Sequence, residues 1–382
     1  HLLEVIQESE LTIKGGDGDG NMGSDDEEDD CEYEDDDDDD AGVGSYRLNV
    51  YAGFINNKKA ALQALGALAE YTKASFFPVL DASLDTLLAE HAGAINSYHT
   101  DIRCEAITCL VQMMDVALAQ HGPTEPPKQG VIVQLHEVTN EMLVVILSTL
   151  INLMDGDGSK DCVGRACDGV AQLLQKVGVV GLTVIVDDAK KSTTMEPLIT
   201  TLTKLVNEKG TCQLEENYEQ NEDDEDDDHD DKVMDSVVDV IGTLAKCMGV
   251  QVVPYFDHFV KPLLKFCKPS RSHSDRAMAI GCFGEVISEI GLESMKYVEL
   301  ILPVLKTACS DDMEPVRRNA AYAVGALVES GGVAMSNYAL PILTVLHPLC
   351  IRPQHQQASD VGGADIDNAL STVCRMINTL PV

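Results

Sequence analysis

Three ten-residue segments in the second half of the chain share one pattern: Val240-Ile-Gly-Thr-Leu-Ala-Lys-Cys-Met-Gly249, Cys282-Phe-Gly-Glu-Val-Ile-Ser-Glu-Ile-Gly291 and Ala323-Val-Gly-Ala-Leu-Val-Glu-Ser-Gly-Gly332. Each segment places two glycines seven residues apart, and successive segments are separated by 42 and then 41 residues. Two earlier copies keep only one glycine: one has Lys73 where the second glycine would be, and the other retains Gly178. A period of about 40–47 residues is typical of stacked helix pairs.

The third segment lies on an expected amphipathic helix between Asp312 and Gly332. Its apolar residues recur at helical spacing along one face, at Val316, Ala320, Ala323, Val324, Leu327 and Val328. Gly325 costs a helix about 1 kcal/mol relative to Ala, so we expect a neighbouring helix to approach it closely. Gly332 would end the helix in the left-handed conformation. A second helix near 338–346 completes the pair, and no segment alternates as a strand would.

The sequence therefore predicts an all-α protein, an α-solenoid (superhelix) of HEAT repeats with two acidic disordered inserts. A core without Trp and with only 4% aromatic residues suits helix-on-helix packing. Because the chain begins at His1 rather than Met, we expect a piece of a longer protein. The expected units are a remnant helix of a preceding repeat at 1–14, an acidic insert at 15–45, HEAT repeats at 46–210, an acidic insert at 211–231 and HEAT repeats at 232–382.

The net charge is concentrated in these two inserts. The 382 residues include 64 Asp and Glu against 27 Lys and Arg, a formal charge of −37. Residues 17–40 hold 16 of the acids and residues 215–231 hold 12, so 36 acids face 27 bases elsewhere, a net −9. The absence of a basic surface argues against nucleic acid and anionic membranes as partners, and favours a basic protein. The longest apolar-rich stretch, Met142–Met154, is 13 residues, shorter than the roughly 20 that a membrane span needs.

No motif for chemistry stands out, so we expect no enzyme activity, no cofactor and no metal. A nucleophile elbow, a Walker loop and an HExxH pattern are all missing. The 12 cysteines include no CxxC pair; the shortest spacings, Cys104 with Cys109 and Cys162 with Cys167, are five residues. Most cysteines lie in apolar runs, where a free thiol behaves as a small hydrophobic group.

Two weaker patterns overlap at the first insert. Residues 18–23 satisfy GxGxxG, but acidic neighbours would repel a phosphate. Residues 17–28 resemble a calcium loop, with Met22 at the position where the loop's sharp turn requires glycine. A calcium-responsive regulator is therefore one alternative hypothesis, which micromolar calcium binding would support.

The two acidic runs are the main candidates for binding a basic partner, because mobile polyanions attract Lys- and Arg-rich segments. The alternative is that they are linkers that keep the array soluble. The candidate residues are Asp35, Asp36, Asp37, Asp38, Asp39, Asp40, Asp223, Asp224, Glu225, Asp226, Asp227 and Asp228. Acids expected on the second helix of each pair are further contributors: Asp81, Asp85, Asp257 and Glu299.

Asp312 and Arg317 suggest a structural role. Asp312 precedes an expected helix and Arg317 lies one turn inside it, with looser echoes at Asp101-Ile-Arg103 and Asp275-Arg276. We interpret the pattern as helix capping combined with a repeat-to-repeat Asp–Arg ladder that stiffens the stack.

The chain resembles the importin-β (karyopherin-β) superfamily of nuclear transport receptors, in the branch of importin-four and importin-five. The resemblance covers nearly all of the chain from about residue 46, and an acidic insert before Lys232 matches that branch. The stretches that carry it are 58–78 (KKAALQALGALAEYTKASFFP), 253–256 (VPYF), 274–285 (SDRAMAIGCFGE) and 315–332 (PVRRNAAYAVGALVESGG).

The resemblance implies a curved superhelix that carries cargo on its inner B helices and offers grooves between its outer A helices to Phe-Gly nucleoporins. It assigns Ran-GTP to N-terminal repeats of the full-length receptor rather than to this piece. We therefore expect the C-terminal portion of a nuclear import receptor that carries basic, histone- or ribosomal-protein-like cargo and shuttles between cytoplasm and nucleus through the nuclear pore. The alternative is a non-transport HEAT-repeat scaffold or assembly-factor subunit that binds basic proteins.

Overall fold

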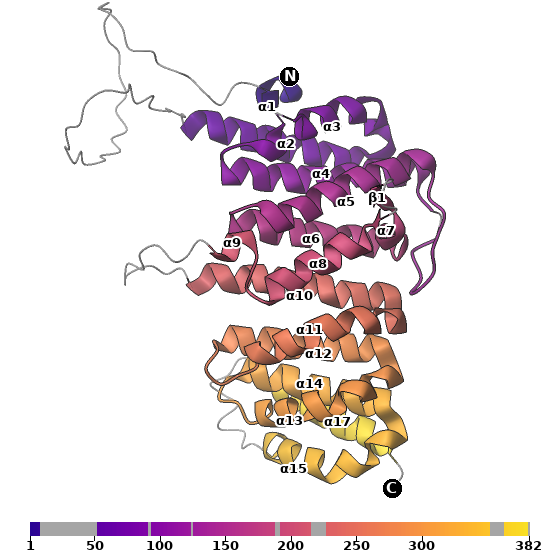
Figure 1. The fold of residues 1–382 in the computed structure, drawn as a ribbon, viewed down its shortest axis with the longest axis vertical. Coiled ribbons are helices and arrows are strands. Elements are labelled where there is room, and N and C mark those ends of the chain that lie inside the picture. The colour runs from indigo at the N-terminus through magenta and orange to yellow at the C-terminus, as the bar shows by residue number, and fades with distance from the viewer. Residues whose placement is uncertain are drawn as a thin grey trace, which may run out of the picture.

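The helices pair and stack along one direction into an elongated solenoid (Figure 1). The computed structural model describes residues 1–7, 52–90, 93–123, 125–187, 192–214, 227–351 and 363–380. The first helices of the pairs, here called A helices, pack side by side in chain order: α2 (Ala52–Thr72), α4 (Thr100–His121), α6 (Lys160–Val177), α10 (Asp227–Met248), α12 (His273–Ile290), α14 (Glu314–Gly331) and α17 (Ala364–Thr379). This arrangement confirms the expected all-α solenoid.

The second helices, here called B helices, form the other layer of the stack. They are α3 (Leu80–Leu88), α5 (Glu137–Gly156), α8 (Met195–Val206), α11 (Val253–Phe266), α13 (Val298–Ala308) and α15 (Ala339–Cys350). The short α1 (Leu2–Gln7) packs against α2 and α3 at the first end of the stack.

The turn between the two helices of a pair has a recurring form. In three successive pairs the A helix ends at a glycine with positive φ: Gly249 at 56°, Gly291 at 55° and Gly332 at 52°. Each glycine is followed directly by a 3-10 turn that leads into the B helix: η4 (Gly249–Val252), η5 (Gly291–Tyr297) and η6 (Gly332–Tyr338). At Gly291 and Gly332 ψ is −132° and −133°, so Gly332 does not take the left-handed helical conformation that was expected for it. This combination of positive φ and negative ψ is open to glycine but not to a residue with a Cβ, which explains the second glycine of the motif.

The first glycine of the motif lies where adjacent A helices pack closely. A Cβ placed on Gly284 would lie 2.8 Å from Cδ1 of Tyr322 on α14. A Cβ on Gly325 would lie 2.5 Å from Oγ1 of Thr372 on α17. The close approach of a neighbouring helix expected at Gly325 is therefore confirmed, and Gly284 shows the same arrangement.

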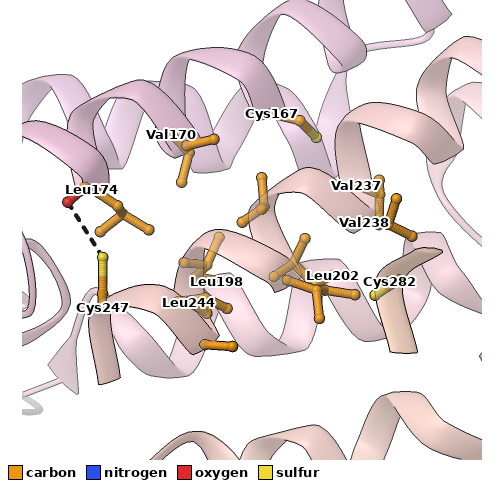
Figure 2. Packing of buried hydrophobic residues seen from close by; sticks show 14 of the residues in the cluster. Cys167, Val170, Leu174, Leu198, Leu202, Val237, Val238, Leu244, Cys247 and Cys282 are labelled. Carbon is orange, nitrogen blue, oxygen red and sulfur yellow. Dashed lines mark hydrogen bonds between the residues drawn. The ribbon is translucent and has the colours of Figure 1, made fainter. Parts of the chain in front are cut away.

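Leu, Val, Ile and Cys side chains fill the space between the two layers (Figure 2). Between α6, α8 and α10, the fully buried Leu174, Leu198 and Leu244 belong to one continuous core. The thiol of Cys247 donates to the carbonyl of Leu174 across 3.4 Å, and burial raises the pKa of this thiol to about 11. Such cysteines stay protonated and pack as small hydrophobic groups.

Two local features differ from the expectation. Residues 185–187 (β1, Ile185–Asp187) pair antiparallel with 192–193 (β2, Ser192–Thr193), a run too short to show alternation in the sequence. Both ends of the stretch expected as the second insert, 211–231, are helical: α9 covers Thr211–Leu214 and α10 already begins at Asp227.

Three helical stretches among the described residues are long and apolar enough to cross a membrane by length and composition: Glu137–Gly156, Lys232–Phe266 and Glu314–Cys350. The expectation that no stretch reaches this length is wrong by that measure, because it counted only the apolar-rich run of 13 residues and not whole helical stretches that include a few polar residues. The second and third stretches each join an A helix to its B helix through a 3-10 turn. They are folded pairs whose apolar faces contribute to the core.

Candidate functional site

The acidic residues expected to bind a basic partner fall outside what the structure describes. This holds for Asp35, Asp36, Asp37, Asp38, Asp39, Asp40, Asp223, Asp224, Glu225 and Asp226. Asp227 and Asp228 lie in the first turn of α10, but their side chains are not described. Their role in binding remains a prediction.

Two of the four acids expected on the B helices are engaged within the protein. Asp257 on α11 accepts hydrogen bonds from Nζ of Lys296 at 2.6 Å and from the hydroxyl of Tyr297 at 2.8 Å. The hydrogen bond from Lys296 is the main reason why the pKa of Asp257 lies below its usual value. Glu299 on α13 accepts a hydrogen bond from the Tyr338 hydroxyl. Both carboxylates therefore link one repeat to the next.

The other two acids, Asp81 and Asp85, are exposed on α3, and Asp85 borders a groove between α3 and α5. One part of this groove, about 480 Å³, is lined by Leu84, Asp85, Leu88, Ala89, Glu141, Met142, Val145 and Ile146. A second part, about 550 Å³, shares Leu88 and Val145 with the first and continues along α5 to Asp157. We call the two parts together the α3–α5 groove.

The α3–α5 groove combines an apolar floor with carboxylates at one end. Val145 is 47% exposed although it lies mid-helix, and Asp85 and Glu141 are both exposed. Among the described residues no Lys or Arg pairs with either carboxylate. We did not single out Glu141 and Val145 from the sequence. The signal available for them was a valine on the side of an amphipathic helix that faces solvent.

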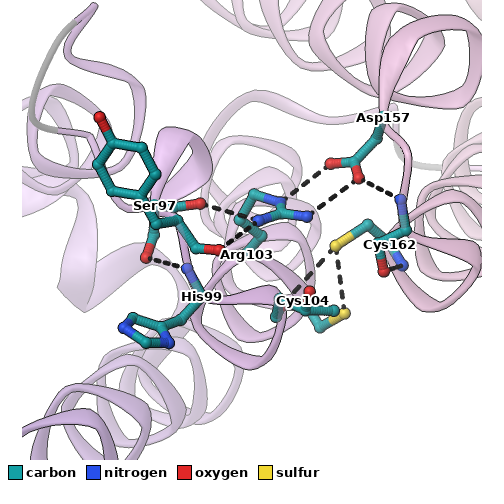
Figure 3. Close-up of polar contacts among 9 residues, drawn as sticks. Ser97, His99, Arg103, Cys104, Asp157 and Cys162 are labelled. Carbon is teal, nitrogen blue, oxygen red and sulfur yellow. Dashed lines mark hydrogen bonds and ion pairs between the residues drawn. The ribbon is translucent and has the colours of Figure 1, made fainter. Parts of the chain in front are cut away.

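The charged groups at the opposite end of the groove are already paired (Figure 3). Arg103 of α4 forms two hydrogen bonds of 3.0 Å to the carboxylate of Asp157, and it also donates to the carbonyls of Ser97 and Tyr98. Burial has the largest single effect and lowers the pKa of Arg103, but the bonds and charge of Asp157 together with the nearby Cys162 sulfur raise it by more, so the pKa lies above its usual value. Only the Asp85–Glu141 end is therefore available to a charged ligand, and that ligand would be a cation.

The Arg103–Asp157 pair belongs to a repeating set of contacts from one repeat to the next, of the kind expected for an Asp–Arg ladder, but the carboxylate before α14 that takes part is that of Asp311 and not that of Asp312. Arg276 binds Asp311 at 2.9 Å, and Arg317 binds the buried Asp365 at 2.7 Å. In each pair an arginine one turn inside an A helix contacts a carboxylate just before, or at the start of, the next A helix. Asp312 gives Arg317 only its main-chain carbonyl, because the carboxylate that points back to the preceding repeat is that of Asp311.

Among the described residues, no group of three or more His, Cys, Asp or Glu side chains could hold a metal ion. The site consists of an elongated apolar groove with an anionic end, which suits a peptide segment that carries apolar and basic side chains.

Comparisons with known proteins agree with this architecture. A family model described as importin subunit beta-1-like TPR repeats matches residues 225–346. The chain is 23% identical over 336 residues to importin-4 of Mus musculus, covering 87% of this chain and 29% of the relative. It is 22% identical over 315 residues to importin-4 of Homo sapiens, with 82% and 27% covered. The chain thus spans less than a third of the length of these relatives.

Solved structures match the fold over a similar range. The karyopherin Kap121p bound to the SUMO protease Ulp1p superimposes with a TM-score of 0.64 at 14% identity, covering 86% of this chain and 29% of Kap121p. Importin beta superimposes with a TM-score of 0.61 at 15% identity, covering 85% and 34%.

The stacked helix pairs, their glycine turns and their arginine ladder define the class of the protein as a HEAT-repeat α-solenoid, the fold that Kap121p and importin beta share with it. In sequence the chain is similar to importin-4, and residues 225–346 match the importin-beta-1-like repeat model.

Proposed function

We propose that this chain is part of a nuclear import receptor that binds basic protein cargo, of the histone or ribosomal-protein kind, and shuttles between cytoplasm and nucleus. The curated relatives are named importins, and Kap121p has been solved in complex with the proteins Ulp1p, Ste12p and Pho4p. A protein ligand also fits the size and shape of the α3–α5 groove.

The observation that carries the proposal is the charge arrangement in the α3–α5 groove. Its cationic residue, Arg103, is neutralised by Asp157, whereas Asp85 and Glu141 stand beside the apolar residues Leu88 and Val145. A Lys or Arg side chain can extend its aliphatic stem over the apolar floor and place its charge at the carboxylates. The groove would therefore prefer basic segments with an apolar neighbour.

We assign the two acidic runs, Asp35–Asp40 and Asp223–Asp228, a different task in the same process. A dense anionic segment raises the local concentration of a cationic partner and speeds its association, and salt weakens this effect. The groove would then provide the specific, shorter-range contacts. The alternative role, that of linkers that only maintain solubility, predicts no change in association rate when the runs are neutralised.

Binding of a fluorescent Lys/Arg-rich histone-tail peptide tests the role of the groove. The double variant D85N/E141Q keeps side-chain size and removes both charges. Since each exposed ionic contact contributes about 0.5–1 kcal/mol, we expect roughly 5- to 30-fold weaker binding by fluorescence anisotropy. Asp81→Asn on the same helix but outside the groove is the matched control, and it should change affinity less than about twofold.

Neutralising the runs tests the second part. Replacing Asp35–Asp40 and Asp223–Asp228 with Asn and Gln should slow association in stopped-flow measurements and reduce its salt dependence, with dissociation little changed. Equal affinity of wild type and D85N/E141Q would contradict the groove assignment. An association rate that stays constant after both runs are neutralised would leave them as solubilising linkers.

Transport itself requires further partners that we assign to the whole receptor. We expect the full-length protein to bind Phe-Gly nucleoporin repeats and Ran-GTP, and to accumulate at the nuclear pore. If a pull-down with the full-length protein recovers neither partner but still captures the histone-tail peptide, the protein is a HEAT-repeat scaffold for basic proteins and not a transport receptor.

A further inference from the structure

Two cysteines from neighbouring A helices lie in contact. Sγ of Cys104 on α4 is 3.6 Å from Sγ of Cys162 on α6, although 58 residues separate them in the sequence (Figure 3). The eleven cysteines that the structure describes are all free thiols. A contact of this kind between two helices requires only a small movement to bring the sulfurs to the roughly 2 Å of a covalent bond.

The surroundings hold this pair in place. Cys162 occupies the first turn of α6, where its backbone N–H donates to the N-cap Ser159 at 3.4 Å and its thiol lies 3.7 Å from the carbonyl of Thr100. The adjacent Arg103–Asp157 pair clamps the start of α4 to the start of α6. Both sulfurs are therefore fixed by contacts that do not depend on a bond between them.

The two thiols differ in accessibility. Cys162 is fully buried, whereas Cys104 is half-buried and lines a cavity of about 510 Å³ between α2, α4, α6 and α10. Charged side chains of both signs line this cavity, among them Lys59, Arg165, Asp101 and Glu105. A small polar oxidant can therefore reach the Cys104 sulfur, whereas the Cys162 sulfur is buried next to it.

We propose that Cys104 and Cys162 are a redox-sensitive pair that forms a reversible disulfide between α4 and α6 when a hydroperoxide enters the cavity. The inference is independent of the proposed transport function, because it concerns the joint between two repeats and not the α3–α5 groove.

The reaction balances with one peroxide per pair. The Cys104 sulfur attacks one oxygen of hydrogen peroxide, the O–O bond breaks, and a sulfenic acid and one water form. The Cys162 sulfur then attacks the Cys104 sulfur, the S–O bond breaks, and the hydroxide takes up the remaining thiol proton as a second water. Two electrons and two protons pass from the thiols to the peroxide, and a dithiol reductant reverses the change.

Electrostatics support Cys162 as the second nucleophile. The hydrogen bond between the two thiols raises the pKa of Cys104, as burial also does, and it lowers the pKa of Cys162, with the positive charge of Arg103 acting in that same downward direction. The Cys104 sulfur therefore attacks the peroxide once the proton of this hydrogen bond has passed to the Cys162 sulfur. Burial raises the pKa of Cys109 to about 12, and among the described residues no second thiol is in hydrogen-bond contact with Cys109 to take up its proton, so it remains an unreactive thiol.

Peptide mapping of the oxidised full chain tests the proposal. The protein is treated with hydrogen peroxide, free thiols are alkylated, and the unreduced digest is analysed by mass spectrometry. We expect a cross-linked peptide joining Cys104 and Cys162, lighter by two hydrogens than the separate peptides, that disappears after dithiothreitol. Cys374, which is exposed and forms no thiol–thiol hydrogen bond among the described residues, is the internal control and should gain oxygen atoms rather than a cross-link.

Single variants separate this outcome from nonspecific oxidation. In Cys162→Ser, Cys104 should proceed to the sulfinic acid; in Cys104→Ser, the buried Cys162 should stay unmodified. Cys109→Ser should cross-link as the wild type does. Failure of the 104–162 peptide to form while Cys104 accumulates as sulfinic acid would overturn the proposal, as would cross-links spread evenly over many cysteine pairs.

Discussion

Lys73 occupies the position where later repeats carry a glycine with positive φ. Its φ is 49°, close to the 55° of Gly291, and the 3-10 turn η1 (Lys73–Val79) follows it as η5 follows Gly291. A residue with a Cβ loses roughly 1–2 kcal/mol in this conformation. The repeat geometry therefore imposes a strained backbone on Lys73 that glycine would relieve.

Exchanging the residue types at these two positions should have opposite effects. We expect Lys73→Gly to raise the free energy of unfolding by up to about 1 kcal/mol, a gain limited by the greater flexibility of glycine in the unfolded chain. Gly291→Ala should lower it by about 1 kcal/mol or more, although no atom lies within 4 Å of the added Cβ, because φ alone is unfavourable. Urea unfolding followed by circular dichroism measures both.

Ala74→Gly, one residue further and on the same exposed turn, is the control for flexibility alone. It should destabilise slightly, since Ala74 gains nothing from the wider φ range. If Lys73→Gly destabilises as much as Ala74→Gly does, the repeat turn does not strain Lys73.

The loop between α4 and α5 ties helix pairs that are not neighbours. We call residues 125–131 the strap; in Figure 1 the loop runs down one edge of the stack from α5 towards α10. The N–H of Gly130 donates to the carbonyl of Cys247 at the end of α10, at 2.7 Å. Nε2 of Gln129 donates to Oε2 of Glu289 on α12 at 2.8 Å. Pro127 packs on Gly178 at the end of α6.

Removing the strap's contacts should loosen the ends of the helices it joins. Gly130→Pro removes the N–H and cannot adopt the φ of 70°, so the carbonyl of Cys247 loses its donor. We expect hydrogen exchange in the last turn of α10 to become at least several-fold faster, because an orphaned helix terminus frays. Gln129→Ala should produce a smaller increase at α10 and α12, and Lys128→Ala, whose side chain contacts only Glu125 among the described residues, should produce none.

The strap also shows which contacts could not be predicted from the sequence. The Pro-rich stretch from Gln120 to Gly130 is typical of a loop, and the glycine spacing and the apolar stripes predicted the helix pairs themselves. The contacts of Gln129, by contrast, join residues 116 and 160 positions away, and no local pattern encodes them. The α3–α5 groove was not predicted from the sequence for the same reason. Asp85 was recognised as a candidate acid, but its proximity to Glu141 depends on how two B helices stack.

Across the whole molecule, contacts recur at the repeat spacing. Gln63 binds Glu105, and Asn319 binds the carbonyl of Ala277, each 42 residues away. The period of the sequence motif is thus also the period of the packing, which is why a repeat count was enough to predict the solenoid. In such an array each repeat contacts mainly its neighbours, so stability is a sum of local terms.

Local unfolding caused by a substitution at one end of the solenoid should therefore remain confined to that end. Arg317 is 7% exposed and its carboxylate partner Asp365 is fully buried, 2.7 Å away. Asp365→Asn would leave the guanidinium charged and buried without a counter-ion, which costs about 3–5 kcal/mol. We expect hydrogen exchange to accelerate in α17 and in α14, against which it packs, while α2, α4 and α6 keep their wild-type rates. Asp367→Asn, on the exposed side of the same helical turn, should leave all rates unchanged. Faster hydrogen exchange along the entire chain would contradict this expectation and show that the stack unfolds as one cooperative unit. The strap, which connects helix pairs that are not neighbours, would then be the first structure to test as the source of that cooperativity.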